Sequence, residues 1–472
     1  MARRLLNSMI FMLAAVLLMG CSDGRDGTKG LEGNNTGNTG AHTPVTITLG
    51  VWPEDSKESE KRAYEEYRDI CKKKYPYITI VPAPYYYSPE TFILKAESGE
   101  LPTVYNTWFT EPQKIIESDY AADITELMKK NGYDRDMNPE ILRLLSKNGS
   151  IYGIPRDAYA LGLFINMNLY RQAGLLEGEG LPRYPGTFDA LVEAAKTIKQ
   201  KTGKAGMFIP TKDHVGGWHF TQLAWAFGAE FEKKAGSRWM ANFNTPEAEA
   251  ALQYIKDLRW KHDVLLPNTQ LSWGDWIKNY GTDQVGMVFA APDMLEAPTN
   301  EYKMKKEDIA IAPIPAGPKG QYSLMGGTAY MFSPHSTPEQ LDAAFKFLDI
   351  AGVTSNITKE ALEGLEIRLR SRHENGVAVG PKPLQVWNNR ERISAEDAIY
   401  EKYANVNMAL FRPYYENTFL SLRPEEPYYT QNLYAILDRV VQEVIMNRDA
   451  EPKAVLEKAN DEFQTKFMNQ NK

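Results

Sequence analysis

The sequence predicts an α/β protein with a helix-rich C-terminal part, and three patterns carry that prediction. Residues 45–52 alternate apolar and polar side chains like a half-buried strand, and residues 56–75 carry apolar positions at helical spacing before a second strand at 77–81. This spacing is typical of a βαβ unit, which implies a parallel sheet with a right-handed crossover. The apolar run 285–290 indicates a strand buried on both faces, and from residue 395 onward the pattern is almost entirely helical.

Local signals place the other elements in order. Each start or stop depends on a side-chain oxygen that caps the first turn, on Pro at the first helical position, or on Gly after the last turn. The elements are a helix from Ser88-Pro89 to Gly99, a strand over 103–106, a helix capped by Thr187 that closes near Gly203, a helix opened by Thr245-Pro246-Glu247, a strand that starts at Gly326-Gly327, and a helix from the capping box Thr337-Pro338-Glu339-Gln340 to Gly352.

Composition excludes several classes of protein. The chain has 472 residues, of which 43% are hydrophobic and 24% charged, and its net charge is −7. That balance is globular, and the length suits about two or three domains at roughly 150 residues each. Because the net charge is acidic, the composition does not indicate a basic surface that would bind nucleic acid. Two cysteines are too few for a fold held together by several disulfides.

The N-terminal residues 1–20 predict a lipoprotein signal peptide. Arg3 and Arg4 precede the apolar run Met9–Met19, which is too short to span about 30 Å of hydrocarbon but has the length of a signal-peptide core. The run ends Leu18-Met19-Gly20-Cys21, which resembles the bacterial lipobox. The resemblance implies cleavage before Cys21, lipid (palmitate among the acyl chains) on that residue, and anchoring on the extracellular face of the cell membrane. The alternative is a plain secretory signal that happens to end in cysteine.

Residues 21–43 are expected to hold the lipidated cysteine and a flexible tether. The segment Ser22–Thr43 is rich in Gly, Asn, Thr and Asp and has almost no large apolar residue, so it cannot contribute to a core. With Cys21 lipidated, Cys71 has no disulfide partner. On a helix of an exported protein, we expect Cys71 to be a buried small hydrophobe.

The motifs of common catalytic and cofactor sites are missing. The chain has no HExxH, GxSxG, Walker A or GxGxxG sequence, so we expect no cofactor and assign no catalytic residue. The spacing of His214 and His219 does not place both on one helical face, so a metal pair is not expected. Segment 134–139 starts like a calcium loop, but Pro139 stands where the sharp turn needs Gly, and bound calcium stays an open question. A glycosidase-like carboxylate pair could be supported only by geometry.

Aromatic and polar side chains follow several of the predicted strands. Trp52 and Glu54 come after the first strand, and Trp108 and Glu111 come after a later one. Asp293 follows the buried run. In open α/β sheets, ligands bind beyond the carboxyl ends of the strands. Aromatic faces stack on sugar rings while carboxylates and guanidinium groups bind hydroxyls, so the combination favours a neutral polar ligand.

Segments in a fixed order carry a resemblance to one known family. They are ITLGVW (47–52), GELPTVYNTWF (99–109), DITELM (123–128), GSIYGIPRDAYALGLFINMNLYRQAGL (149–175), PGTFDALVEAAKTI (185–198), DQVGMVFAAPDML (283–295), PIPAGPKGQYSLMGGTAYMFSPHS (313–336) and AFKFLDIAG (344–352). In this order, behind a lipobox, the chain resembles the extracellular solute-binding proteins of family 1, the carbohydrate-binding receptors of ABC importers. The resemblance covers residues 45 to about 350 well and the C-terminal region more loosely.

The resemblance implies a two-lobed, periplasmic-binding-protein-like (type II) fold with hinge crossover strands, which closes on ligand between its lobes. The N-terminal lobe would take residues 44–158 plus 293–333, the C-terminal lobe would take 162–290 plus 334–472, and the hinge strands would be 160–166 and 328–333. The ligand would be a sugar or oligosaccharide, delivered to the ABC permease transmembrane subunits. We expect the protein to be a monomer.

The resemblance also implies a set of ligand-binding positions between the lobes. They are Trp52, Glu54, Trp108, Glu111, Tyr159, Trp218, Asp293 and Gly327. Trp218 is either a stacking platform or a core residue at a helix start, and Gly327 either lets ligand approach the backbone or forms a tight bend. Arg156 and Asp157 are either a hydroxyl-binding fork or a surface ion pair.

Departures from the family pattern leave the ligand open. Maltose-type members carry Trp where this chain has Pro292-Asp293, and Glu where it has Tyr159. Segment 411–429 either lengthens the wall of the cleft or packs against the second lobe. Three weaker candidates for ligand contact are Trp273, Trp276 and Trp387.

Three functions compete at this stage. The favoured one is a lipid-anchored sugar receptor of an ABC importer. The second is a receptor for another solute, such as a polyamine or peptide, for which the carboxylates of Glu54, Asp55, Glu111 and Asp293 would be the binding groups. The third is an anchored polysaccharide-degrading enzyme, which would need an acid/base pair that no motif indicates.

Overall fold

The computed structural model describes residues 43–55, 58–83, 85–236, 238–380, 382–417 and 421–470. The predicted signal peptide, the lipidation site Cys21 and the tether up to residue 42 lie outside the described residues. Within them, the strands are β1 (Val45–Leu49), β2 (Ile78–Pro82), β3 (Val104–Trp108), β4 (Ser146–Lys147), β5 (Ser150–Ile151), β6 (Gly153–Ala160), β7 (Gly162–Asn166), β8 (Ala205–Met207), β9 (Glu232–Ala235), β10 (Arg238–Ala241), β11 (Val285–Ala290), β12 (Ile309–Ala312), β13 (Ser323–Phe332) and β14 (Leu422–Pro424).

Helices account for most of the remaining described residues. They are α1 (Glu58–Lys74), α2 (Phe92–Glu97), α3 (Pro112–Glu117), α4 (Thr125–Asn131), α5 (Tyr133–Asp136), α6 (Pro139–Leu144), α7 (Met167–Ala173), α8 (Phe188–Thr202), α9 (Val215–Trp225), α10 (Pro246–Trp260), α11 (Trp273–Gly281), α12 (Glu296–Glu301), α13 (Pro338–Ile350), α14 (Lys359–Glu374), α15 (Arg390–Tyr403), α16 (Arg412–Asn417), α17 (Thr430–Met446) and α18 (Pro452–Lys466). The predicted α/β class with a helix-rich C-terminal part is confirmed, with β14 as a short strand within that part.

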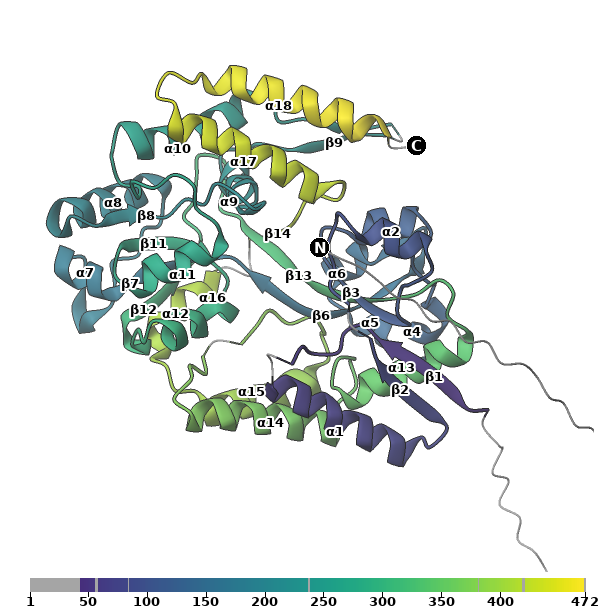
Figure 1. The fold of residues 1–472 in the computed structure, drawn as a ribbon. Coiled ribbons are helices and arrows are strands. Elements are labelled where there is room, and N and C mark those ends of the chain that lie inside the picture. The colour runs from purple at the N-terminus through teal and green to yellow at the C-terminus, as the bar shows by residue number, and fades with distance from the viewer. Residues whose placement is uncertain are drawn as a thin grey trace, which may run out of the picture. The chain divides into compact units, whose positions relative to one another are not determined.

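The first sheet has the strand order β14–β13–β3–β1–β2, and β6 pairs with β13 (Figure 1). β1 runs parallel to β2, so the predicted βαβ unit is confirmed, with α1 between the two strands. Ile47 and Leu49 are fully buried, as the alternation predicts. β13 begins at Ser323, before the predicted Gly326-Gly327, because its first residues pair with β14.

The second sheet has the order β12–β7–β11–β8. β11 is the predicted apolar run, and all of its residues are buried. It lies between β7 and β8 and is contacted by α7, α8 and α11, which explains why no polar side chain alternates along it.

The predicted caps of α8, α10 and α13 are confirmed, but the predicted helix start at Ser88-Pro89 is wrong, because α2 begins at Phe92 after Thr91. The hydroxyl of Thr187 accepts a hydrogen bond from the Ala190 amide at the start of α8, and Gly203 ends that helix in the left-handed conformation. Thr337 and Gln340 form both bonds of the capping box that opens α13. These caps satisfy backbone groups that the first turn of a helix leaves unpaired.

Each sheet builds its own hydrophobic core, and the cores meet on the crossing strands β6 and β13. Along β6, Ala158 belongs to the core of the first sheet and Ala160 to that of the second. Along β13, Met325 belongs to the first core and Leu324 to the second. We call the two bodies the first lobe and the second lobe, and the chain passes between them at these residues.

The predicted lobe boundaries are wrong in three places. β12 lies in the piece 293–333 assigned to the N-terminal lobe, yet it pairs with β7 in the second sheet. α13 lies in the piece 334–472 assigned to the C-terminal lobe, yet it packs on α1 and β1. The predicted hinge strand 328–333 pairs with β3 inside the first lobe, so the crossing lies earlier in β13. Local sequence patterns do not reveal such long-range pairings.

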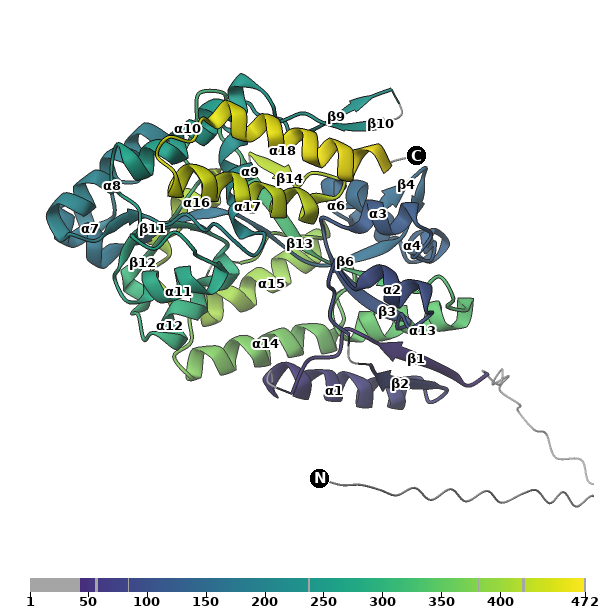
Figure 2. The same ribbon diagram turned by 45° about the horizontal axis from the view of Figure 1, so that its top comes forward.

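A third connection between the lobes is the helical pair α14–α15. The two helices pack on each other through a small core of their own, made by Leu365, Leu369 and Val379. Beyond α15 the chain enters the second lobe, where Phe411 and Tyr414 are buried in the core. α17 and α18 then lie against each other on that lobe, close to α10 (Figures 1 and 2).

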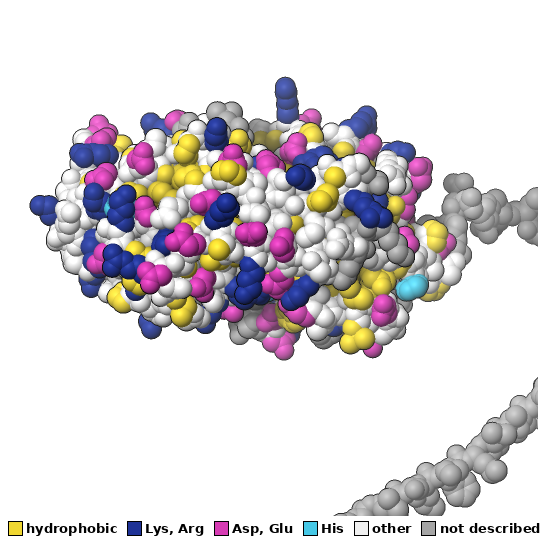
Figure 3. Space-filling view, turned by 90° about the horizontal axis from the view of Figure 1, so that it is seen from above, with side chains coloured by type: hydrophobic (Ala, Val, Ile, Leu, Met, Phe, Trp, Pro, Cys, Tyr) yellow, Lys and Arg dark blue, Asp and Glu magenta, His cyan; other side chains and the backbone are white. Residues whose placement is uncertain are grey.

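The surface carries charges of both signs. On the face that includes α10, α17 and α18, basic and acidic side chains are interspersed, with no large patch of one sign (Figure 3). Among the described residues, no helix is long and apolar enough to cross a membrane.

Cys71 is fully buried on α1, as predicted, and burial raises the pKa of its thiol to about 11.

The contact between α9 and α17 requires a glycine. A Cβ added to Gly217 would lie 2.3 Å from the carbonyl oxygen of Tyr434, and main-chain atoms cannot move aside independently. We expect Gly217→Ala to lower the free energy of unfolding by about 1–3 kcal/mol, because overpacking forces the helices apart. Gly274, on α11, is the control: its added Cβ meets nothing within 4 Å, and Gly274→Ala should be neutral or slightly stabilising. Urea titration measures both variants, and equal midpoints for the two would contradict the packing argument.

Candidate functional site

The first lobe presents an aromatic ring and a carboxyl group at the end of β3. Trp108 is the last residue of that strand and is 38% exposed. The ring of Tyr87 packs edge-on against it at 5.2 Å, and the Tyr87 hydroxyl donates a hydrogen bond to Glu111 at 2.5 Å. Glu111 is almost fully buried at the N-terminus of α3, where the helix dipole favours negative charge.

The second lobe presents a matching set around the start of α9. The rings of Trp218 and Tyr159 meet edge-on at 6.2 Å, and Trp218 also contacts Trp273. Tyr159 lies on β6 between the two cores. Glu425 is buried nearby and accepts a hydrogen bond from the Tyr434 hydroxyl at 2.9 Å. We call Tyr87, Trp108, Glu111, Tyr159, Trp218 and Glu425 the inter-lobe cluster.

Three contacts join the two lobes beside this cluster. The Gln431 amide, on α17, donates to the Thr110 hydroxyl of the first lobe at 3.2 Å, and the Tyr428 hydroxyl donates to Glu117 of α3. The Lys114 ammonium lies 5.5 Å from the ring centre of Tyr429. These contacts are polar and few, so they can separate at modest cost if the lobes move.

Burial sets the charge of the carboxyl groups in and near the cluster. Burial is the main reason that the pKa of Glu425 is raised to about 8; the hydrogen bond from Tyr434 lowers this pKa, and the charge of Glu111 makes a smaller contribution that raises it. Glu425 is therefore largely neutral at pH 7 and can both donate and accept hydrogen bonds. Reduced hydration raises the pKa of Asp293 to about 6, with a smaller contribution from the charge of Asp157.

Arg156 and Asp157 form an ion pair, at 3.4 Å, on the strand that crosses between the lobes. Both side chains are partly exposed, and Asp157 also accepts bonds from the amide and hydroxyl of Thr328 on β13. Asp157 therefore fixes the register of the two crossing strands and presents its remaining oxygen next to Arg156.

Several predicted site residues lie elsewhere or have a structural role. Trp52 packs its ring on Tyr64 of α1 with Arg68 over its face, and Glu54 is exposed in the loop before α1. Gly327 lies inside β13, where an added Cβ would be 2.4 Å from the Asp157 carbonyl oxygen and 2.7 Å from the Phe109 ring. The predictions of a tight bend or a ligand approach at Gly327 are therefore replaced by close packing of strand and ring.

The three weaker tryptophan candidates separate clearly. Trp276 and Trp387 are fully buried, so the prediction of ligand contact is wrong for them. Trp273 is partly buried and supports the ring of Trp218 from behind. Tryptophan side chains are usually buried in a core, and whether one face of the ring stays exposed depends on the residues packed around it. The sequence alone does not show which residues these are.

Segment 411–429 divides between the two roles left open by the sequence. Its first half packs in the second lobe, where the Tyr414 hydroxyl donates to the Ala160 carbonyl at 2.8 Å. Its second half supplies Glu425 to the cluster and Tyr429 to the contact with Lys114.

Sequence reasoning missed Tyr87, Gln431 and Glu425 as site residues. The only signal was the repeat of carboxyl and aromatic side chains in RPEEPYY, at 423–429. Among the described residues, no group of His, Cys, Asp and Glu has the geometry to hold a metal ion.

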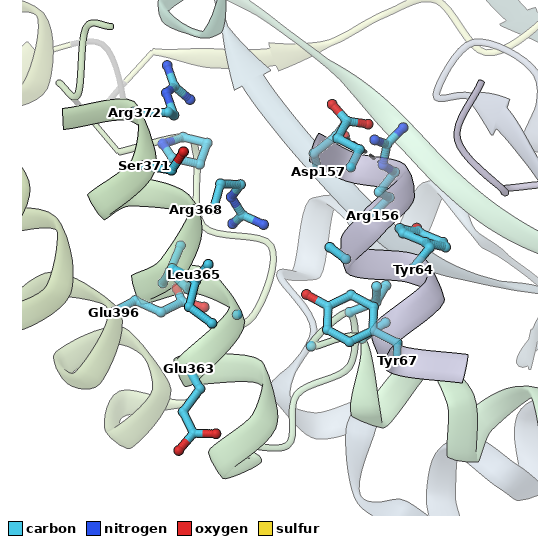
Figure 4. A pocket seen from close by; sticks show the side chains of 18 of the residues that line it. Tyr64, Tyr67, Arg156, Asp157, Glu363, Leu365, Arg368, Ser371, Arg372 and Glu396 are labelled. Carbon is cyan, nitrogen blue, oxygen red and sulfur yellow. Dashed lines mark ion pairs between the residues drawn. The ribbon is translucent and has the colours of Figure 1, made fainter. Parts of the chain in front are cut away.

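The structure also has a separate cavity of about 1060 Å³, which none of the six cluster residues lines. It is lined by α1 on one side and α14 on the other (Figure 4), and Arg156, Asp157 and Tyr330 of the crossing strands also line it. Glu296 and Asn300 of α12 add a wall from the second lobe.

The buried carboxyl of Glu425 gives a pH dependence of stability with a defined sign. An unfolded glutamate titrates near 4.5, and the folded protein holds the same proton up to about pH 8. The folded state therefore binds more protons in that window, and stability is lost as the pH rises through it. We expect Glu425→Gln to remove this loss, so that the variant gains at least about 1 kcal/mol over wild type between pH 5 and pH 8. Urea denaturation at both pH values measures the change, and a difference that is constant with pH would contradict the assignment.

Comparison with known proteins agrees with the resemblance predicted from sequence. The model of the bacterial extracellular solute-binding protein family matches residues 57–352. The arabinooligosaccharide-binding protein of Halalkalibacterium halodurans is 26% identical over 210 residues, which are 43% of this chain and 44% of that relative. The chain thus spans less than half the length of the first curated relatives it matches. The arabinooligosaccharide-binding protein of Bacillus subtilis is 24% identical over 368 residues, 73% of this chain and 74% of the relative.

Solved structures share the two-lobed fold. The cyclic α-maltosyl-1,6-maltose binding protein of Arthrobacter globiformis superposes with a TM-score of 0.65 at 21% identity, over 89% of this chain and 98% of that one. A solute-binding protein of an ABC transporter from Thermotoga lettingae, bound with α-D-tagatose, gives a TM-score of 0.65 at 17% identity, over 89% and 99% of the two chains. The likeness at this identity shows the fold alone. With the family match over more than half of its length, the chain belongs to the bacterial extracellular solute-binding protein family.

Proposed function

We propose that the protein is the lipid-anchored binding component of an ABC importer, which captures a sugar or oligosaccharide between its lobes and delivers it to the permease. The observation that carries the proposal is the inter-lobe cluster. Aromatic rings and hydrogen-bonding carboxyl groups from both lobes converge where the chain crosses between them. Such a site suits a solute with apolar ring faces and hydroxyl edges.

Closure of the two lobes on the ligand follows from the position of the cluster, where the chain passes from one lobe to the other. A ligand that touches both halves of the cluster makes contacts in the closed form that the open form cannot make, so its binding shifts the equilibrium toward closure. The crossing strands connect two separate cores, so each lobe moves as a unit while the residues between the cores change conformation. The closed form would be the one that the permease recognises.

A sugar is favoured over a polyamine by the protonation of the site. A polyamine needs carboxylates that are ionised, and the raised pKa of Glu425 leaves one of the two carboxyl groups of the cluster largely neutral at pH 7. The names of the arabinooligosaccharide-binding relatives support carbohydrate and make arabino-oligosaccharides the first probes.

Binding rather than catalysis also agrees with the site. The relatives named above are binding proteins. The two carboxyl groups closest to an acid/base pair, Glu111 and Glu425, are both over nine-tenths buried and are bonded to tyrosine hydroxyls. Each carboxyl group therefore holds a tyrosine hydroxyl in place.

Substitution of the exposed tryptophan tests the ligand site. We expect Trp108→Ala to weaken binding of arabino-oligosaccharide by about 30-fold or more, because stacking rings at the centre of a site contribute about 2 kcal/mol or more. Calorimetric titration measures the affinity, and circular dichroism checks the fold.

Tyr75 provides the matched control, since it is a partly buried aromatic residue at the end of α1. Tyr75→Ala should leave the affinity unchanged. Wild-type affinity in Trp108→Ala would remove that residue from the site. If wild type binds no carbohydrate in a thermal-shift screen but does bind a polyamine or a peptide, the solute class is wrong.

Lipid attachment is tested at its own residue. In bacterial cells fed a palmitate analogue, the wild-type protein should carry label and sediment with membranes, whereas Cys21→Ser should lose both. Cys71→Ser is the control, because Cys71 is buried in the folded lobe and should not be modified. Label that is retained in Cys21→Ser would exclude the anchor.

A further inference from the structure

A chain of hydrogen bonds runs from the second lobe to the first beside the inter-lobe cluster. Nδ1 of His214 lies 3.1 Å from the amide oxygen of Gln431, and the amide nitrogen of Gln431 donates to the Thr110 hydroxyl at 3.2 Å. That hydroxyl donates to Glu111 at 3.3 Å, and Glu111 also accepts from the Tyr87 hydroxyl. We call His214, Gln431, Thr110 and Glu111 the relay. It connects a histidine of the second lobe to two residues of the cluster in the first lobe.

The bonds of the relay have one possible direction. The Thr110 hydroxyl has a single proton, which it donates to Glu111, so it can only accept from Gln431. The oxygen of the Gln431 amide therefore faces His214. Because an amide oxygen only accepts, Nδ1 of His214 must carry a hydrogen. A neutral imidazole has this hydrogen in one of its two tautomers, whereas a protonated imidazole always has it.

The backbone fixes the place of the His214 ring. Asp213 and His214 have φ angles of 60° and 69°, in the left-handed region that few side chains adopt. The Asp438 carboxyl, on α17, accepts from the amides of His214 at 2.7 Å and of Gly217 at 2.8 Å, and these bonds hold the turn at the start of α9. His214 is only partly buried, so its ring can exchange protons with solvent.

The first lobe presents a net negative charge to His214. Glu90 lies just before α2, and the hydrogen bond from Ser88 is the main reason that its pKa is lowered. The positive charges of His214 and Lys114 lower the pKa of Glu90 further. The Lys114 ammonium lies 4.0 Å from Glu111, so these two charges of the first lobe compensate each other. The charge of Glu90 is left to attract a protonated His214.

The charged groups that face or flank His214 in its own lobe are Asp438, Lys212 and Asp213. They keep their places around His214 when the lobes separate, so their effect is the same in the open and the closed form. The charges of the first lobe approach His214 only on closure, and they therefore favour one form over the other.

We propose that His214 is a positioning residue that couples closure of the lobes to pH, because its protonated form strengthens the relay and attracts the first lobe. The closed form, and with it solute binding, is then favoured as the pH falls. An imidazole changes its charge between about pH 5 and pH 8, and a charged donor makes a hydrogen bond about twice as strong as a neutral one. The inference rests on the proposed function, since it concerns the closure by which the solute is captured.

The pH dependence of affinity tests this coupling in wild type and in His214→Asn. Asparagine adopts the left-handed conformation readily and its amide can donate to Gln431, but it does not titrate. Calorimetric titration with arabino-oligosaccharide at low ionic strength gives the ratio of the affinities at pH 5.5 and pH 8. This ratio should be about fivefold larger in wild type, the difference between a charged and a neutral donor. Glu425 titrates in both proteins, so its effect cancels in the comparison.

A second measurement needs no ligand. Ser118, at the end of α3, and Lys233, on β9, are exposed positions in the first and the second lobe. Spin labels on Ser118→Cys and Lys233→Cys, in the full chain with Cys21→Ser, report the distance between the lobes. The population with the shorter distance should increase from pH 8 to pH 5.5, and His214→Asn should remove this increase.

His262→Asn is the matched control. His262 follows α10, and the charged groups that act on it all belong to the second lobe: Lys261, Asp257, Lys196 and Glu193. This variant should keep the pH dependence of wild type.

The distances decide the outcome. If they have the same pH dependence in wild type and in His214→Asn, the coupling is overturned while the proposed function stands. Distances that respond to pH only when His214 is present, in a protein that binds no carbohydrate, would support the coupling and overturn the proposed solute.

Discussion

The structure depends on β6 and β13, because each of these strands contributes residues to both hydrophobic cores. Each strand leaves one hydrophobic core and enters the other within one or two residues, so the two lobes share backbone but not packing. Burial of apolar surface stabilises each lobe separately. The side chain between the cores is Tyr159, whose hydroxyl lies so close to Gly326 that a Cβ there would be 2.3 Å away. The crossing is therefore tightly packed at Tyr159, which also packs against the core of the second lobe.

The ligand site follows from this exchange. The ends of β3 and of the crossing strands bring Trp108 and Tyr159 toward one another, and α9 adds Trp218 from the second lobe. Parallel strands end at one edge of a sheet, so the loops that follow them gather there. In this chain, helices α9 and α17 of the second lobe add Trp218 and Gln431 to the residues that gather there.

Buried carboxyl groups give the site its chemical character. Desolvation costs several kcal/mol for a charged group, and the protein meets this cost with hydroxyl donors and with protonation. Tyr87 donates to Glu111 and Tyr434 donates to Glu425. A site built in this way presents oriented hydrogen-bonding groups, which is the chemistry that a hydroxyl-rich solute needs.

The sequence by itself determined the local structure of this protein. Caps at Thr187 and Thr337, the apolar run of β11 and the βαβ unit at the start all depend on residues a few positions apart, and each is found as predicted. Trp108 could be singled out for a similar reason, since a tryptophan directly after a strand lies at the sheet edge.

Only the tertiary structure decided which lobe each segment joins and which candidates share a site. β12 and α13 exchange lobes relative to the prediction because pairing with β7 and packing on β1 depend on residues far apart in the chain. For the same reason, Trp387 is a core residue and Glu425 is a site residue. Burial is set by what other segments bring to a residue, and that information is not contained in its neighbours along the sequence.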